Sequence, residues 1–166
     1  VFDNLLHAVD ELQEPNIKIL VFGDVTKIDL DSLKRNDIIL PPHTNMDAFY
    51  SSLAASDLVF QHQGLATLEQ AISARVPTIA NVMTYPDDEY PNLHIGEVQP
   101  FAHVGVCVLH TRTTPISKIA ESIHTYLFDE QAIADMKKNQ KKQWSDGEPE
   151  LIRRTDAAYK EKFASL

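Results

Sequence analysis

The chain has 166 residues, 43% of them hydrophobic, which is enough to bury one sizeable core and predicts a single domain over residues 1–166. Its 15 Lys and Arg stand against 24 Asp and Glu, and the resulting net charge of -9 excludes the basic footprint typical of nucleic-acid and anionic-membrane binding. The single cysteine, Cys107, excludes an internal disulfide and a cysteine metal cluster, and this favours a reducing, cytoplasmic setting. No apolar run approaches the ~20 residues of a membrane span.

Helical and extended patterns alternate along the chain. Apolar residues recur every three or four positions in the helical stretches, and short apolar runs bounded by Gly, Pro or Asn mark the strands. The predicted elements in chain order are helix 2–13, strand 17–22, strand 37–40, helix 46–54, strand 57–61, helix 67–74, strand 77–82, helix 92–102, strand 103–110, helix 116–127, helix 129–142 and helix 149–164.

This alternation, with near-continuous apolar strands, predicts an α/β fold: a Rossmann-like, doubly wound parallel sheet with helices on both faces. The helices within 129–166 close the same domain. Thr44 or Asn45 is expected to cap the helix that starts at residue 46, and Thr114-Pro115 to cap the helix that starts at residue 116. The polar stretch 83–91 is too long for a simple turn, and such loops often carry function.

One strand-to-helix turn, residues 62–67, has the chemistry of a phosphate site. Ligands of doubly wound sheets bind beyond the carboxyl ends of the strands, where this turn is expected. Gly64 lets the backbone approach a ligand, and the free N–H groups at the start of the following helix favour phosphate. His62 and the Thr67 hydroxyl add donors. Glycine also serves such turns for geometry alone, and a histidine at a strand end can cap backbone carbonyls, so the turn by itself leaves both interpretations open.

Two motifs resemble the donor-site signature of GT-B glycosyltransferases. The first runs from Ser56 to Thr67 and continues through Glu69-Gln70-Ala71 to Val76-Pro77. The second, Asp88-Glu89-Tyr90-Pro91-Asn92, is similar to the Asp-Gln-x-x-Asn segment that such enzymes place after the next strand. The resemblance covers roughly residues 44–127. It implies the donor-binding half of a glycosyltransferase, which binds a nucleoside-diphosphate sugar of the uridine or thymidine type for transfer of the sugar to an acceptor.

The resemblance also implies a role for individual residues. Carboxylates suit sugar recognition because each accepts hydrogen bonds from neighbouring hydroxyls. The implied ligand-binding residues are His62, Gly64 and Thr67 for the diphosphate, Glu69 and Gln70 for the ribose, and Asp88, Glu89 and Asn92 for the sugar.

Three positions depart from the family pattern. Gln63 replaces the usual second glycine of the turn, and Glu89 stands where glutamine is usual. The helix acid expected to bind ribose falls on Gln70, with Glu69 one place early. Because neighbouring helical residues point about 100° apart, Glu69 and Gln70 cannot both serve the same pair of hydroxyls.

The remaining polar residues predict no second site. Six other histidines lack metal-ligand spacing, so no metal and no cofactor other than the nucleotide-sugar substrate is expected. Asp24 ends a strand and can reach the crevice, although Gly-Asp is an ordinary turn pair. The lysines between 137 and 142 are typical of a solvated helix face. The histidines without a predicted role are His7, His43, His94, His103, His110 and His124.

No residue of the sequence is identified as the catalytic base. The resemblance implies that acceptor binding and the base belong to an N-terminal domain or partner subunit, and the chain opens in a helix without the first strand expected of a donor half. It is therefore interpreted as a fragment or half-enzyme. Two alternatives stay open: an epimerase or hydrolase acting on a nucleotide-sugar, and a nucleotide-binding or assembly module without turnover.

Overall fold

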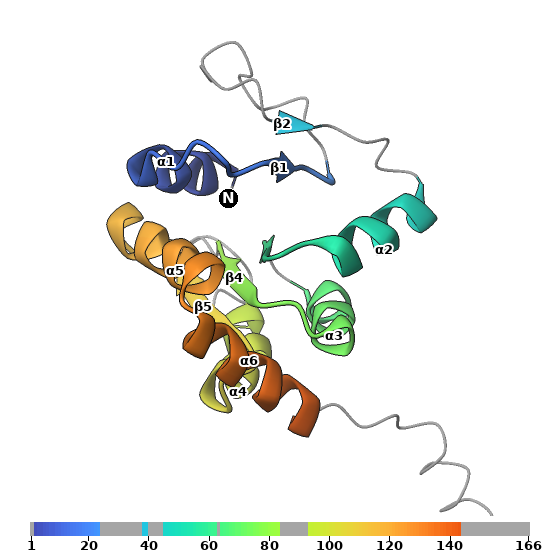
Figure 1. Cartoon of the computed structure of the whole chain (residues 1–166). Coiled ribbons are helices and arrows are strands. Elements are labelled where there is room, and N and C mark those ends of the chain that lie inside the picture. Colours follow the sequence, from blue (N-terminus) through green and yellow to red (C-terminus); the bar gives the residue numbers. More distant parts are fainter. Residues whose placement is uncertain (1, 24–37, 40–44, 63, 84–92, 144–166) are drawn as a thin grey trace, which may run out of the picture.

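The computed structural model describes residues 2–23, 38–39, 45–62, 64–83 and 93–143, which form helices and parallel strands (Figure 1). The predicted α/β class is therefore confirmed. The helices are α1 (Phe2–Leu12), α2 (Met46–Ala55), α3 (Leu65–Ala74), α4 (Leu93–His103), α5 (Ile116–Phe128) and α6 (Glu130–Gln143), and the strands are β1 (Ile19–Leu20), β2 (Ile38–Ile39), β3 (Val59–Gln61), β4 (Thr78–Val82) and β5 (Val108–Thr111).

Every strand pair in the described ranges is parallel. β4 lies between β3 and β5, with Phe60 opposite Ile79 and Ile79 opposite Val108. β1 and β2 form a separate pair with Ile19 opposite Ile38. Parallel strands need a crossover between them, and the intervening helices provide it. The arrangement is compatible with a single Rossmann-like domain.

The central strand β4 is buried along its whole length because helices pack against both of its faces. Side chains alternate between the two faces of a strand. Ile79 therefore packs in the cluster that contains residues of α1 and α5, whereas Ala80 and Val82 pack on the opposite face with residues of α3 and α4. β4 therefore contributes apolar side chains to a separate hydrophobic cluster on each of its faces.

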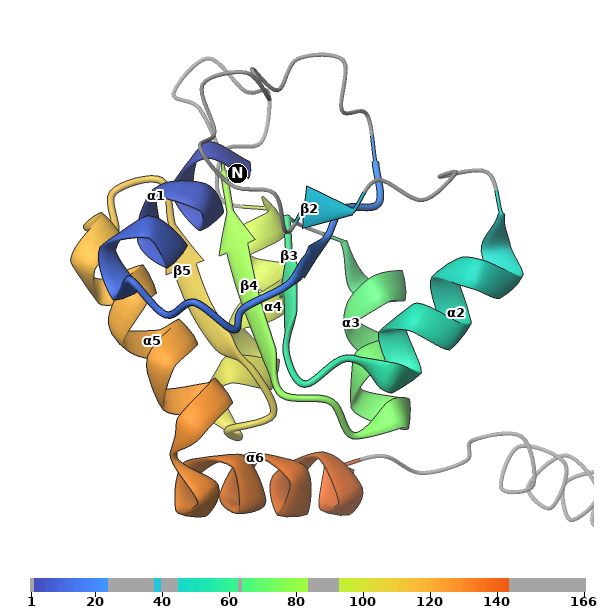
Figure 2. The ribbon, with the colours of Figure 1, turned by 45° about the horizontal axis from the view of Figure 1, so that its top comes forward.

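Helix α6 crosses the amino ends of the strands (Figure 2). The buried Gln140 amide donates to the carbonyl oxygens of Val76, at 2.8 Å, and Val106, at 3.0 Å, which precede β4 and β5. Asn139 also donates to the Gly105 carbonyl at 3.4 Å. These bonds satisfy carbonyl groups at the end of the sheet where the chain enters the strands.

Several element boundaries differ from the sequence prediction, and the strands at 17–22, 37–40 and 57–61 are shorter than expected. α3 begins at Leu65, two residues early, because Gly64 adopts a φ of 107° and turns the chain directly into the helix. The predicted strand 103–110 is wrong over its first half: α4 continues to His103, Gly105 turns at a φ of 73°, and β5 starts only at Val108. The predicted helix 149–164 lies outside the described residues.

Of the two predicted helix caps, one is confirmed and the other is wrong. Asn45 caps α2, since its side-chain oxygen accepts a hydrogen bond from the Ala48 N–H at 3.0 Å. Thr114 does not cap α5, because its hydroxyl instead accepts from the Thr111 N–H at 2.9 Å. Within the described ranges, no helix combines the length and apolar character needed to cross a membrane.

Candidate functional site

The candidate site lies at the carboxyl edge of the sheet. β3 ends at Gln61, and His62 and Gly64 lead from it into α3. The start of α1 reaches the same edge, because the Asn4 amide contacts the Met83 sulfur at 3.8 Å just beyond β4. The beginnings of helices and the ends of strands therefore meet here, as expected for a ligand crevice of a parallel α/β sheet.

His62 lies within electrostatic range of His94, which comes from the first turn of α4. The His62 side chain is solvent-exposed, but surrounding protein atoms desolvate the ring enough to lower its pKa, and the positive charges of the N-terminal amino group and then of His94 lower that pKa further. His94 in turn pairs with Glu97 at 2.9 Å. A lowered pKa favours the neutral imidazole, which offers one N–H donor and one acceptor nitrogen.

Gly64 and Thr67 lie at the start of α3. Gly64 is the N-cap of the helix, and its φ of 107° is a conformation that other residues rarely adopt. A Cβ atom at this position would meet no atom within 4 Å, so glycine is required by the backbone conformation and not by lack of space. In the part of the chain that the structure describes, no side chain caps α3, which leaves N–H groups of its first turn available to a ligand. Thr67 lies inside this first turn, half-buried.

Both residues predicted to bind ribose line a groove of about 420 Å³ between α2 and α3. The Gln70 amide donates to the Tyr50 hydroxyl at 3.4 Å, which links the two helices across the groove. Glu69 is solvent-exposed. The groove is lined by Tyr50, Leu53, Ala54, Ala66, Glu69, Gln70, Ser73 and Ala74.

The predicted sugar-binding residues Asp88, Glu89 and Asn92 lie outside the described residues, as do Asp24 and Gln63. The structure thus brings His62, Gly64 and Thr67 together around the start of α3. It places Glu69 and Gln70 farther along the same helix, facing α2.

Sequence reasoning missed two buried amides near the carboxyl edge. Gln61 is 6% exposed and Asn81 is fully buried, yet neither amide oxygen nor amide nitrogen of either residue has a hydrogen-bond partner among the described residues. Gln61 pairs with Ala80 and so faces α3 and α4, whereas Asn81 pairs with His110 on the opposite face. A polar amide interrupting an otherwise apolar strand was the available signal.

His94 was also missed as part of the site, because the sequence contains no motif that links it to His62. His110 is buried within the fold: its Nε2 lies 2.9 Å from the Ser122 hydroxyl, and burial lowers its pKa. Burial raises the pKa of the Cys107 thiol to about 12, so this cysteine is held as the unreactive thiol.

In the part of the chain that the structure describes, no group of three or more His, Cys, Asp or Glu side chains is arranged to hold a metal ion. No known family model matches the sequence, and no curated protein matches it. The functional argument therefore depends on the chemistry of the residues themselves.

Proposed function

We propose that this chain is the donor-binding half of a GT-B-type glycosyltransferase, built on a doubly wound sheet, and that its carboxyl edge binds a nucleoside-diphosphate sugar of the uridine or thymidine type. One observation carries the proposal. His62 follows β3 directly and is joined through Gly64, at positive φ, to a helix whose first turn has no side-chain cap from the described residues.

The diphosphate is assigned to this turn. Uncapped N–H groups and the positive end of the α3 dipole both favour a negatively charged ligand. The neutral His62 ring donates one further hydrogen bond, and the Thr67 hydroxyl supplies another from within the first turn. Because the chain carries a net charge of -9, such local donors are what attract an anion to it.

The ribose is assigned to the groove between α2 and α3. Gln70, on the wall of this groove, offers an amide to the ribose hydroxyls, and Glu69, at the neighbouring position, offers a carboxylate as the alternative partner. The hydrogen bond from Gln70 to Tyr50 holds the amide in place before a ligand arrives. Asp88, Glu89 and Asn92 are assigned to the sugar, because they belong to the loop that follows the next strand.

The chain is proposed to act with an N-terminal acceptor-binding domain or partner subunit, which supplies the acceptor site and the catalytic base. A nucleotide-binding module without turnover is the second candidate. One observation favours it: Gln70 stands where the family places an acid, and its amide is already engaged by Tyr50.

Isothermal titration calorimetry tests the donor site directly. Uridine diphosphate or thymidine diphosphate is expected to bind with equal affinity in EDTA and in Mg²⁺, because helix N–H groups and not a metal hold the phosphates. Binding that requires Mg²⁺ or Mn²⁺ would contradict this, and no binding of either nucleotide would reject the donor site.

The same titration separates sugar recognition from nucleotide recognition. In the double variant Asp88→Ala/Glu89→Ala, affinity for UDP-glucose is expected to fall while affinity for UDP stays level, because these acids are assigned to the sugar alone. The unaltered chain titrated with both ligands is the control. Equal losses for both ligands would assign the loop to the nucleotide or to the fold.

A further inference from the structure

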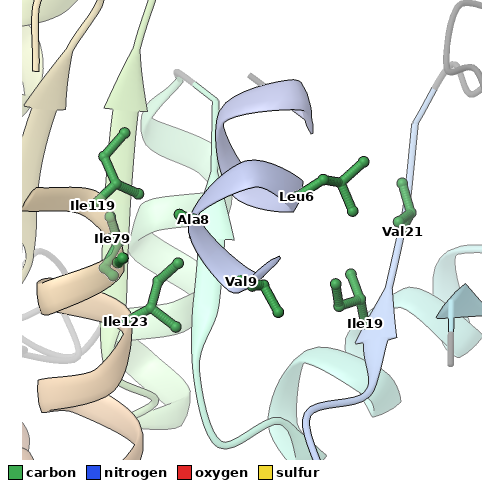
Figure 3. Close-up of a cluster of buried hydrophobic side chains, with 9 residues drawn as sticks. Leu6, Ala8, Val9, Ile19, Val21, Ile79, Ile119 and Ile123 are labelled. Carbon is green, nitrogen blue, oxygen red and sulfur yellow. The ribbon is translucent and has the colours of Figure 1, made fainter. Parts of the chain in front are cut away.

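The helices that surround the sheet differ in how tightly they pack. α1 and α5 meet over β4 through one buried hydrophobic cluster, to which Leu6, Ile79 and Ile119 belong (Figure 3). α2 and α3 instead leave the groove of about 420 Å³ between them. Tyr50, on the wall of this groove, is 44% exposed, and Met46, four positions earlier on the same face of α2, is 51% exposed. The groove and its border therefore expose apolar surface.

The lining of the groove suits a helix. Half of the lining residues have small side chains, which let a second helix approach closely, and Leu53 adds apolar surface. Glu69 contributes the one charged side chain of the lining, and its charge is negative. The small residues are Ala54, Ala66, Ser73 and Ala74. The occupant that fits is a helix with an apolar stripe and basic residues near it.

Residues 149–164, which the sequence predicts to be helical, have that composition. At 3.6 residues per turn, the large apolar side chains of this segment fall on one side together with Thr155. They are Leu151, Ile152, Tyr159 and Phe163. The segment contains four basic and three acidic residues, whereas the whole chain has a net charge of -9. Its basic residues favour a surface that carries Glu69.

Helix α6 ends next to the groove. The Gln140 amide donates to the carbonyl of Val76, two residues beyond the end of α3. α6 continues for only three more residues, about 4.5 Å along its axis, and in both ribbon views its end lies on the α3 side (Figures 1 and 2). The groove reaches the same end of α3, where Ser73 and Ala74 line it. Residues 144–148 provide up to about 17 Å of chain to connect α6 to the groove.

We infer that residues 149–164 fold back as an amphipathic helix into the groove between α2 and α3, with the apolar side facing the groove. The connection sets the direction: the segment enters at the end of α3 and therefore runs antiparallel to it. A helix of this length is about 24 Å long and α3, with ten residues, is about 15 Å long, so the segment spans the groove. This docking does not depend on what the carboxyl edge binds.

Docking has one consequence for ligand binding, and this consequence alone rests on the proposed function. Glu69 and Gln70 line the groove and are the residues to which the ribose is assigned. A helix in the groove covers both, so the docked segment and the nucleotide compete. The segment thereby acts as an autoinhibitory element of the donor site.

Disulfide formation in the full 166-residue chain tests the docking. Ser73→Cys lies on the groove and Thr155→Cys on the apolar side of the segment, while burial keeps Cys107 an unreactive thiol by raising its pKa to about 12. A disulfide requires Cα atoms within about 7 Å, so an intrachain bond is expected to form at least about tenfold faster in glutathione buffer than in the control Ser73→Cys/Ala157→Cys. Ala157 has nearly the same tether but lies on the opposite side.

Equal rates in the two cysteine variants would overturn the docking, because a flexible tether brings both positions to Ser73 equally often. Disulfides that form only between chains would overturn it as well, since the occupant would then be a second copy.

Amide hydrogen exchange measures the docking without a covalent bond. Ile152→Asn/Tyr159→Asn makes the apolar side polar, and amides of α2 and α3 are expected to exchange at least about threefold faster than in the unaltered chain. Ala157→Asn/Ala164→Asn is the matched control: it introduces the same residue at the same spacing on the opposite side, and exchange should stay unchanged. Equal exchange of α2 and α3 in all three proteins would overturn the docking.

The same variants test the competition by calorimetry with uridine diphosphate. Affinity is expected to rise about threefold or more in Ile152→Asn/Tyr159→Asn and to stay level in the control. Unchanged affinity together with faster exchange would reject the competition and the ribose assignment while supporting the docking. No binding by any of the three proteins would reject the proposed function, and the cross-linking result would still decide the docking.

Discussion

The two edges of the central sheet use the same chemical group in opposite ways. At the amino edge, the buried Gln140 amide donates to two backbone carbonyls that lead into β4 and β5. At the carboxyl edge, the buried amides of Gln61 and Asn81 bond to no described residue, and no side chain of a described residue caps α3. Among the described residues, the Gln140 side-chain nitrogen is paired at the amino edge and only its oxygen lacks a partner, whereas at the carboxyl edge both polar atoms of Gln61 and of Asn81 lack one.

This contrast separates polar residues that stabilise the fold from polar residues that are available to a ligand. An unpaired buried amide costs about 1–3 kcal/mol, so leaving such groups unpaired lowers the stability of the carboxyl edge. A bound ligand that completed these hydrogen bonds would remove this cost. The contrast therefore predicts large stability effects at the amino edge and binding effects at the carboxyl edge.

The largest effect is expected from Gln140→Met. Methionine has a similar length but cannot donate, so the buried Val106 carbonyl loses its side-chain donor and the Val76 carbonyl keeps only the hydrogen bond from the Thr78 hydroxyl. The free energy of unfolding should fall by about 2–4 kcal/mol, measured by urea denaturation. Gln143→Met is the control, because Gln143 is exposed on the same helix and should change stability by less than about 0.5 kcal/mol. Equal effects of the two variants would contradict a closed amino edge.

His62→Ala sharpens the comparison from the other edge. Loss of a hydrogen bond to a charged diphosphate should weaken nucleotide binding by about 1.5–3 kcal/mol, while the melting temperature stays close to that of the unaltered chain. Calorimetry and thermal melting are measured on the same samples. His103→Ala, at the exposed end of α4, is the control and should leave affinity unchanged. If His62→Ala lowered stability and left affinity intact, His62 would be a structural cap.

Gly64→Ala is expected to have a smaller effect on the fold, of about 1–3 kcal/mol, because alanine is strained at a φ of 107° although no atom obstructs its Cβ. Gly96→Ala is the matched control. Gly96 lies within α4, where a Cβ also meets nothing within 4 Å, and alanine should stabilise that helix by up to about 1 kcal/mol. Chemical denaturation of both variants measures the difference. Opposite signs are the expected result, and two stabilising substitutions would contradict the strained turn.

The smallest effect concerns pH and His110. Burial lowers the pKa of His110 in the folded state below its ordinary value of 6.5, so the unfolded chain binds a proton first as the pH falls. Stability should therefore decrease as the pH drops below 6.5, and the decrease from this residue ends once the folded-state pKa is passed. Equilibrium unfolding of the native chain and of His110→Asn at pH 8 and pH 5.5 measures it.

The variant is expected to lose less stability than the native chain between those two pH values. At pH 8, where His110 is neutral in both states, the difference in stability between the two proteins reports only the changed packing and the lost hydrogen bond to Ser122. Identical pH dependence in the two proteins would show that His110 does not contribute to acid sensitivity.

Much of the fold could be predicted from local patterns. Apolar residues recur within 2–13 with the period of a helix, and α1 forms there because that period places Leu6 and Val9 on one buried face. The run 77–82 carries apolar residues on both faces, as expected of a strand covered by two helix layers, and β4 is buried throughout. The cap at Asn45 was likewise local, since the oxygen and the N–H that it binds are three residues apart.

Two predictions failed because the same local residues are compatible with more than one structure. The strand expected at 103–110 begins late because Gly105 turns and α4 extends to His103, and an apolar run alone does not distinguish a buried turn from a strand. Thr114 had the right chemistry for a cap, but its hydroxyl bonds to Thr111 instead.

The sequence by itself determined the α/β class, the order of the elements in the described ranges and the position of His62 and Gly64 at a strand-to-helix turn, because each follows from residues close together in the chain. Only the tertiary structure decided that His94 comes within electrostatic range of His62, that Gln140 bonds to the carbonyls at the amino edge, and that β4 lies between β3 and β5. Those features join segments that are distant in sequence, and their pairing is set by packing and sheet register, which no local pattern encodes.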